Sequence, residues 1–142
     1  MKLRSLVFVF LAALAVASMG NPATAQAQAS LLRLTVPFDF YFGNERLSAG
    51  SYTIERVHST DVVRISDQGG HVVLALTNAA EAAPRDLRRS KVVFNRYGDT
   101  YFLSKVQWEE HPTARELPTA KAEVEIAKSI SGKSVVGVSA RR

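Results

Sequence analysis

The chain has 142 residues, of which 46% are hydrophobic and 22% are charged, with a formal net charge of +5 and no cysteine. This length corresponds to one domain, and the hydrophobic fraction excludes a chain that is disordered throughout. The absence of cysteine excludes a disulfide scaffold, thiolate metal ligands, a cysteine nucleophile and an acylated cysteine anchor.

The first 25 residues have the pattern of a secretory signal peptide. Two basic residues near the start precede an uncharged apolar run, Leu6–Ala17, and small residues follow it. This run is too short for a membrane-spanning helix, which needs about 20 apolar residues. We expect cleavage after Ala25, with Ala27 and Ala29 as alternatives, so that residues 26–30 form a flexible start of the mature chain.

Removal of the signal peptide changes the charge of the protein. Two basic residues leave with it, and the formal net charge falls from +5 to +3. A charge this small does not favour nucleic acid as a partner, because nucleic-acid-binding proteins carry a clustered basic face. We therefore expect an exported protein, periplasmic or extracellular, whose mature chain has no transmembrane segment.

From Leu31 onward, apolar residues recur mostly at every second position, as in half-buried strands. Turn signals separate these runs about every 8–12 residues. The clearest hairpin connection is Arg96–Asp99, in which Gly98 is expected to adopt a positive φ. The pattern predicts a β-rich domain over residues 31–132, as a single antiparallel β-sandwich or small barrel of six to seven strands.

Four segments are expected outside the strands. Asn78–Ser90 predicts a long loop, and the polar stretch Glu109–Leu117 discourages regular structure. Residues 120–130 predict a C-terminal α-helix capped by Thr119. Its apolar stripe, which we expect to pack on the sheet, consists of Ala120, Val124, Ala127 and Ile130. Residues 133–142 are interpreted as a flexible tail, with a short strand through its valines as the alternative.

Four segments of the mature chain are distinctive together: VPFDF at 36–40, AGSYT at 49–53, VVFNRYGDTYFL at 92–103 and RELP at 115–118. They resemble a family of small exported bacterial proteins that are usually described as uncharacterised. The resemblance implies a signal peptide, a mainly β domain and a C-terminal helix. It implies no known reaction, so no catalytic residue is carried over.

Candidate chemical residues are scattered along the chain. Zinc ligands commonly include closely spaced pairs, whereas the three histidines are far apart: His58, His71 and His111. A glycoside hydrolase needs two carboxylates across a cleft, and no spacing in the sequence pairs the four candidates, Asp39, Glu55, Glu109 and Glu110. We therefore predict no catalytic residue, no metal site and no cofactor.

Two groups of residues are interpreted as binding surfaces. Positive charge concentrates at five residues, which we interpret as an anion-binding patch: Arg85, Arg88, Arg89, Lys91 and Arg96. Three aromatic residues are consecutive, so strand alternation cannot bury all of them on one face. With the single tryptophan they form a predicted apolar contact surface for the helix, a partner or an apolar ligand: Phe40, Tyr41, Phe42 and Trp108.

These observations favour a non-catalytic exported β-domain that acts as a binding or structural module of the cell envelope. Its expected partner is an anionic envelope polymer or another envelope protein. Two alternatives stay open. One is a carrier of a small apolar ligand held between the sheet and the C-terminal helix, and the other is a carboxylate-based hydrolase.

Overall fold

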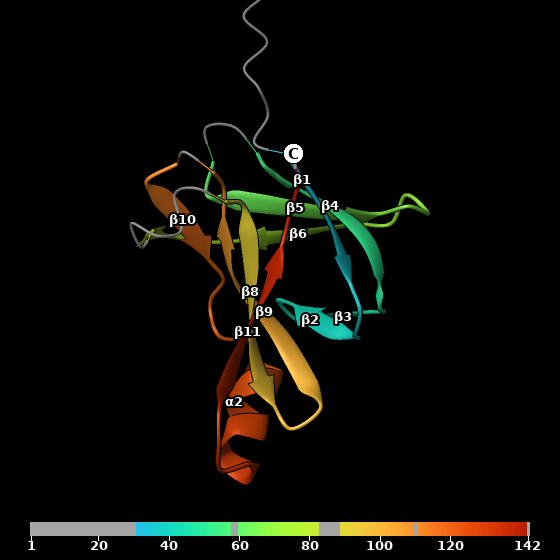
Figure 1. Ribbon diagram of the computed structural model, residues 1–142. Helices are drawn as coiled ribbons and strands as arrows, with labels where there is room; N and C mark the ends of the chain where they lie inside the picture. The colour runs from blue at the N-terminus through green and yellow to red at the C-terminus, as the bar shows by residue number, and fades with distance from the viewer. Residues whose placement is uncertain (1–30, 58–59, 83–88, 110, 142) are drawn as a thin grey trace, which may run out of the picture.

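The computed structural model describes residues 31–57, 60–82, 89–109 and 111–141. They form two β-sheets and a single helix, which is the predicted β-sandwich with a C-terminal helix (Figure 1). The two sheets do not close into a barrel. The predicted signal peptide and the flexible start of the mature chain, residues 1–30, lie outside the described residues.

The first sheet, sheet A, has four antiparallel strands. Their spatial order is β1 (Leu31–Val36), β4 (Gly50–Arg56), β5 (Val62–Asp67) and β6 (Val72–Leu76). Burial alternates along β1 and β4, so that Leu32 and Ile54 face the core while Arg33 and Thr35 face solvent. The period-two pattern of the sequence therefore predicted this sheet correctly.

The second sheet, sheet B, is built around a long hairpin. Its spatial order is β11 (Ser134–Ser139), β8 (Lys91–Tyr97), β9 (Thr100–Gln107), β10 (Thr113–Glu116) and β7 (Asn78–Glu81). A short hairpin joins it at β9, made of β2 (Phe40–Phe42) and β3 (Glu45–Leu47). Gly98 connects β8 to β9 with φ of 58°, which confirms the prediction for this turn.

The described residues form eleven strands, more than the six to seven that we expected. Asn78–Glu81 was expected in a loop and Thr113–Glu116 in an irregular stretch, yet they pair with each other as β7 and β10. Ser134–Ser139, expected in a flexible tail, forms β11 and pairs with β8 along its whole length. Each of these strands is defined by a partner distant in the sequence, which a local pattern does not contain.

The helix α2 (Lys121–Ser129) covers one end of sheet B, at the lower end of the molecule in Figure 1. Of the expected apolar stripe, Ala120 is buried against the sheet, but Ala127 is exposed and Val124 and Ile130 are 41% and 37% exposed. The residues that face the sheet are Ala122, Glu123 and Ile126. The predicted cap by Thr119 is also wrong, because the N-cap residue is Ala120 and no side chain caps the helix. No helix in the described part of the chain is long and apolar enough to cross a membrane.

The main core lies between the two sheets and is rich in aromatic rings. Phe40 makes edge-to-face contacts with Tyr52 of sheet A and Phe94 of sheet B, with ring centroids 5.3 Å apart in both pairs. Phe38 stacks on Tyr101 at 3.8 Å. Such pairs add about 0.5–1.5 kcal/mol each to the burial of the rings. The VPFDF and VVFNRYGDTYFL segments therefore meet in space and hold the sheets together.

The two sheets are also joined at two of their edges. At one edge, only Thr77 separates β6 of sheet A from β7 of sheet B. The buried Arg115 of β10 binds Asp61, which directly precedes β5 of sheet A, at 2.6 Å. At the other edge, Arg33 of β1 forms an isolated antiparallel bridge with Arg141, just beyond β11. This second connection places the two ends of the described domain side by side.

Candidate functional site

The predicted anion-binding patch is brought together only in part. Arg85 and Arg88 lie outside the described residues, and Arg89 is exposed just before β8. Lys91 and Arg96 lie near opposite ends of β8, so they do not share one site. The Arg96 guanidinium instead pairs with Asp99 at 3.7 Å and lies over the Tyr101 ring at 5.5 Å. The described part of the patch is therefore spread along the hairpin.

The predicted apolar contact surface is mostly core. Phe40, Phe42 and Trp108 are each 1% exposed, because β2 and the end of β9 face the other sheet. Tyr41 points to the opposite face of β2 and stacks on Phe102, with ring centroids 4.9 Å apart. This second aromatic cluster, formed by Tyr41, Tyr97 and Phe102, lies beneath α2, so the helix covers Tyr41.

The scattered histidines and carboxylates take part in separate local contacts. Asp39 pairs with Arg46 at 3.0 Å, Glu55 pairs with Arg64 at 3.2 Å, and His71 pairs with Glu45 at 3.0 Å. His58 and Glu110 lie outside the described residues. The Glu109 backbone N–H donates to the Ser90 hydroxyl oxygen, and His111 follows β9. Within the described ranges, no three such side chains gather where a metal ion would bind.

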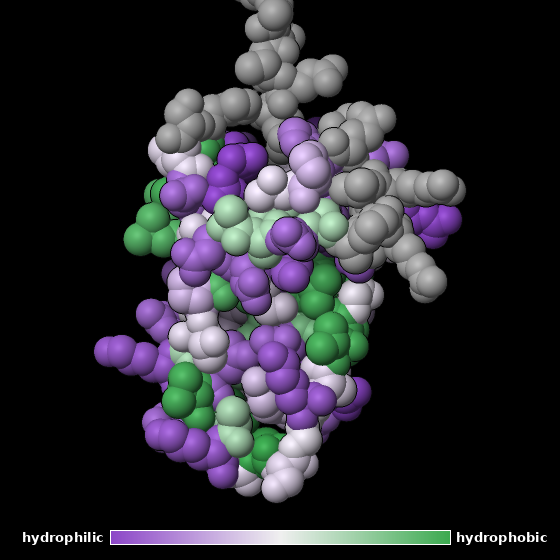
Figure 2. Space-filling model, turned by 90° about the vertical axis from the view of Figure 1, so that its left-hand side faces the viewer, coloured by the Kyte–Doolittle hydropathy of each residue, from purple (hydrophilic) through white to green (hydrophobic). Residues whose placement is uncertain are grey.

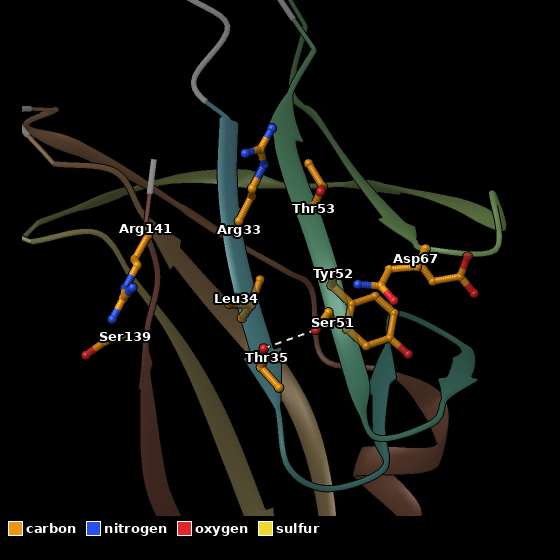
Figure 3. Close-up of a pocket in the computed structure, with 10 residues that line it drawn as sticks. Arg33, Leu34, Thr35, Ser51, Tyr52, Thr53, Asp67, Ser139 and Arg141 are labelled. Atoms are coloured by element: carbon orange, nitrogen blue, oxygen red, sulfur yellow. Dashed lines mark hydrogen bonds between the residues drawn. The ribbon is translucent and has the colours of Figure 1, made fainter.

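The most distinctive surface feature is a polar cleft of about 750 Å³ along the outer side of β1 and β4 (Figure 3). Residues from β1, β4, the β5–β6 turn and the C-terminal strand line it: Arg33, Leu34, Thr35, Ser51, Tyr52, Thr53, Asp67, Gln68, Ser139 and Arg141. Four of these residues carry hydroxyl groups on short side chains, and the Thr35 and Ser51 hydroxyls hydrogen-bond each other at 3.1 Å. We call this feature the polar cleft.

Tyr52 holds β4 in place beneath the polar cleft. Its ring packs in the core against Phe40, and its hydroxyl donates to the Ser48 carbonyl at 2.6 Å. Burial is the main cause that raises the pKa of the Tyr52 phenol, and the carboxylates of Asp67 and Asp39 add to it. The phenol therefore stays protonated and keeps this hydrogen bond at neutral pH.

Charge is distributed unevenly in the polar cleft. Arg33 and Arg141 lie together where β1 meets the C-terminal segment, whereas Asp67 and Gln68 come from the β5–β6 end. In Figure 3 the two guanidinium groups point in opposite directions, away from each other. The two arginines make one end of the cleft positive, and the hydroxyl side chains lie along the rest of it.

A second hollow, the apolar groove, has a volume of about 760 Å³ and lies beside the unpaired edge of β6. It is bordered by the β2–β3 turn, by residues 73–76 and by the segment that leads into α2. Figure 2 shows the side of the molecule on which β10 lies in Figure 1, where hydrophobic residues gather in separate groups among hydrophilic ones.

Sequence reasoning missed the polar cleft because its residues come from both ends of the domain. Arg141 was expected in a flexible tail, so nothing placed it beside Arg33. The sequence feature that indicated this arrangement was the group of valines in residues 135–138. It favoured the short strand that was the alternative to a flexible tail. That strand brings Arg141 to the edge of β1.

Comparisons with known proteins do not assign a function to this chain. No family model, no curated protein and no solved structure matches the chain.

Proposed function

We propose that this protein is a non-catalytic binding module, exported to the cell envelope, that holds a segment of an anionic envelope polysaccharide in the polar cleft. The observation that carries the proposal is the row of short hydroxyl side chains on β1 and β4 beside two arginines. Hydroxyls of Thr and Ser both donate and accept hydrogen bonds, which suits the hydroxyls of a sugar chain.

The location of the polar cleft supports binding rather than chemistry. It runs along the exposed side of a strand pair whose other side is the main core, so its side chains are fixed by the sheet. Thr35 of β1 lies opposite Ser51 of β4, and Thr53 lies two residues further along the same face. A groove that is open along a sheet accepts a polymer, because the chain can leave at both ends.

The proposal is tested by removing hydroxyls without changing side-chain shape. In the double variant Thr35→Val with Thr53→Val, we expect the affinity for an acidic oligosaccharide to fall about 30-fold, since two lost net hydrogen bonds of about 1 kcal/mol each amount to about 2 kcal/mol. Isothermal titration calorimetry with the purified protein measures this change. The matched control is Thr113→Val on β10, which lies outside the polar cleft and should bind like the wild type. Failure of the wild-type protein to bind any oligosaccharide would contradict the proposal.

The carrier alternative rests on the apolar groove. Phe42, Leu117 and Ala120 contribute to its wall, and the first residue of α2 borders it, so an apolar molecule would lie near the start of the helix. The volume of about 760 Å³ falls within the range of small-molecule sites. Titration with a fluorescent long-chain fatty acid distinguishes the two functions, because only a carrier would bind it more tightly than the oligosaccharide.

A further inference from the structure

Arg33 and Arg141 are held directly opposite each other by the backbone. The Arg33 nitrogen donates to the Arg141 carbonyl at 2.6 Å, and the Arg141 nitrogen donates to the Arg33 carbonyl at 2.8 Å. Residues that exchange both hydrogen bonds in an antiparallel pair have Cα atoms about 5.5 Å apart and side chains on the same face. The fold therefore fixes the bases of two cationic side chains next to each other, although like charges in such a pair are destabilising.

The rest of the fold does not neutralise this pair. Among the residues that the structure describes, neither guanidinium has an ion-pair partner, whereas Arg46, Arg64 and Arg115 are each paired with a carboxylate. The nearest acid in the polar cleft, Asp67, belongs to the opposite end and accepts the backbone N–H of His71 at 2.9 Å. Both arginine side chains are exposed and can turn toward a ligand.

We infer that Arg33 and Arg141 form a clamp for the carboxylate of one acidic sugar unit. This inference rests on the proposed function, because it assumes that the polar cleft holds a sugar chain. Guanidinium groups match a carboxylate geometrically, and two of them can engage both of its oxygens.

If the two arginines form a clamp, their substitution should affect the Tm differently from the substitution of arginines that stabilise the fold. Replacing either arginine with glutamine keeps the backbone bridge but removes the repulsion between like charges. In the absence of ligand, Arg33→Gln and Arg141→Gln should therefore each raise the Tm by about 2 °C. The same two variants should lose affinity for the acidic ligand.

Binding is measured by calorimetry with three probes: a tetrasaccharide of alternating glucuronate and N-acetylglucosamine, the neutral chitotetraose, and inorganic phosphate. We expect the wild-type protein to bind the acidic tetrasaccharide at least tenfold more tightly than the neutral one. Arg33→Gln and Arg141→Gln should abolish that preference. The control Arg46→Gln removes an exposed arginine that is paired with Asp39, outside the polar cleft, and should keep the preference.

The outcomes separate the inference from the function on which it rests. Equal binding of both tetrasaccharides by the wild-type protein would overturn the clamp and leave the proposed function standing. Binding of neither would overturn the proposed function. Inorganic phosphate that binds as tightly as the acidic tetrasaccharide would overturn the assignment to a sugar carboxylate, and a lower Tm in both glutamine variants would show that the arginines are structural.

Discussion

Glu123 is a buried carboxylate that attaches the helix to the sheet. It is 5% exposed, and its Oε1 accepts hydrogen bonds from the Asn95 side-chain amide at 2.8 Å and from the Tyr97 hydroxyl at 3.2 Å. Burial is the main cause that raises the pKa of Tyr97, and the charge of Glu123 and the hydrogen bond to it add to the shift. The phenol therefore remains a donor to the carboxylate, and α2 docks through a polar contact as well as through Ile126.

Removing this carboxylate should destabilise the protein substantially. We expect Glu123→Ala to lower the free energy of unfolding by about 2–3 kcal/mol, because hydrogen bonds to a charged group contribute about 1.5–3 kcal/mol and two buried donors lose their acceptor. Urea denaturation followed by circular dichroism measures the change. Glu125→Ala on the same helix is the control, since Glu125 is exposed and its pair with Lys128 contributes at most about 1 kcal/mol. Equal effects of the two substitutions would contradict this role of Glu123.

The β8–β9 turn and the helix differ in how far their single residues could be predicted from the sequence. Gly98 was predictable because its turn is local, and its positive φ follows from four consecutive residues. The buried face of α2 was not predictable, because its partners on β8 lie 26 and 28 residues away. A helical pattern gives the spacing of apolar residues, but it does not reveal that an acid is buried against a distant tyrosine and asparagine.

Strand β6 is the unprotected edge of sheet A. The Asp67 N–H donates to the His71 carbonyl at one end of the β5–β6 pairing, and the Thr77 N–H donates to the Asp61 carbonyl at the other end. Along an antiparallel strand, every second residue directs its backbone N–H and C=O groups toward the partner strand. The backbone groups of residues 72, 74 and 76 therefore face away from β5. The side chains at these positions are Val72, Leu74 and Leu76, which are 44%, 61% and 72% exposed. The strand contains no charge and no proline, which are the usual means of preventing edge-to-edge pairing.

We expect the purified protein to self-associate at high concentration through this edge. A lysine at its centre should prevent pairing, so Leu74→Lys should lower the self-associated fraction measured by sedimentation velocity over a range of concentrations. Its stability should stay within about 0.5 kcal/mol of the wild type, since the site is exposed. The control is Val124→Lys on α2, which replaces an exposed aliphatic residue away from any sheet edge. Equal association of all three proteins would exclude β6 as the contact.

The elements that local patterns missed share one physical property. The strands β7 and β11 pair with strands that are distant along the chain, and β10 pairs with the distant β7 as well as with the neighbouring β9. Strands that are half-buried by the core, such as β1 and β4, show alternation in the sequence itself. The candidate site was missed for the same reason, because it forms only when β11 aligns with β8 and carries Arg141 to the edge of β1.

At the scale of the whole molecule, the sandwich is held at two edges by different chemistry. One edge combines the continuous β6–β7 path with the Asp61–Arg115 pair, in which the arginine side chain is 7% exposed and the aspartate side chain 69%. The other edge depends on two backbone hydrogen bonds between Arg33 and Arg141. The first edge is covalently continuous, whereas the second joins the two ends of the domain and is closed by hydrogen bonds.

The proximity of the two ends predicts tolerance to circular permutation, because a short linker can join the end of β11 to the start of β1. New termini placed between Gly69 and Gly70 would open an exposed turn and cut no strand. We expect this permuted chain to fold with a free energy of unfolding within about 1 kcal/mol of the unpermuted domain, as measured by urea denaturation. The control opens the chain between Phe102 and Leu103, in the buried centre of β9, and should not fold. If the chain opened at Gly69 also fails to fold, then the Arg33–Arg141 bridge does not define a closed edge of the sandwich, and the clamp would lose the rigid base on which its geometry depends.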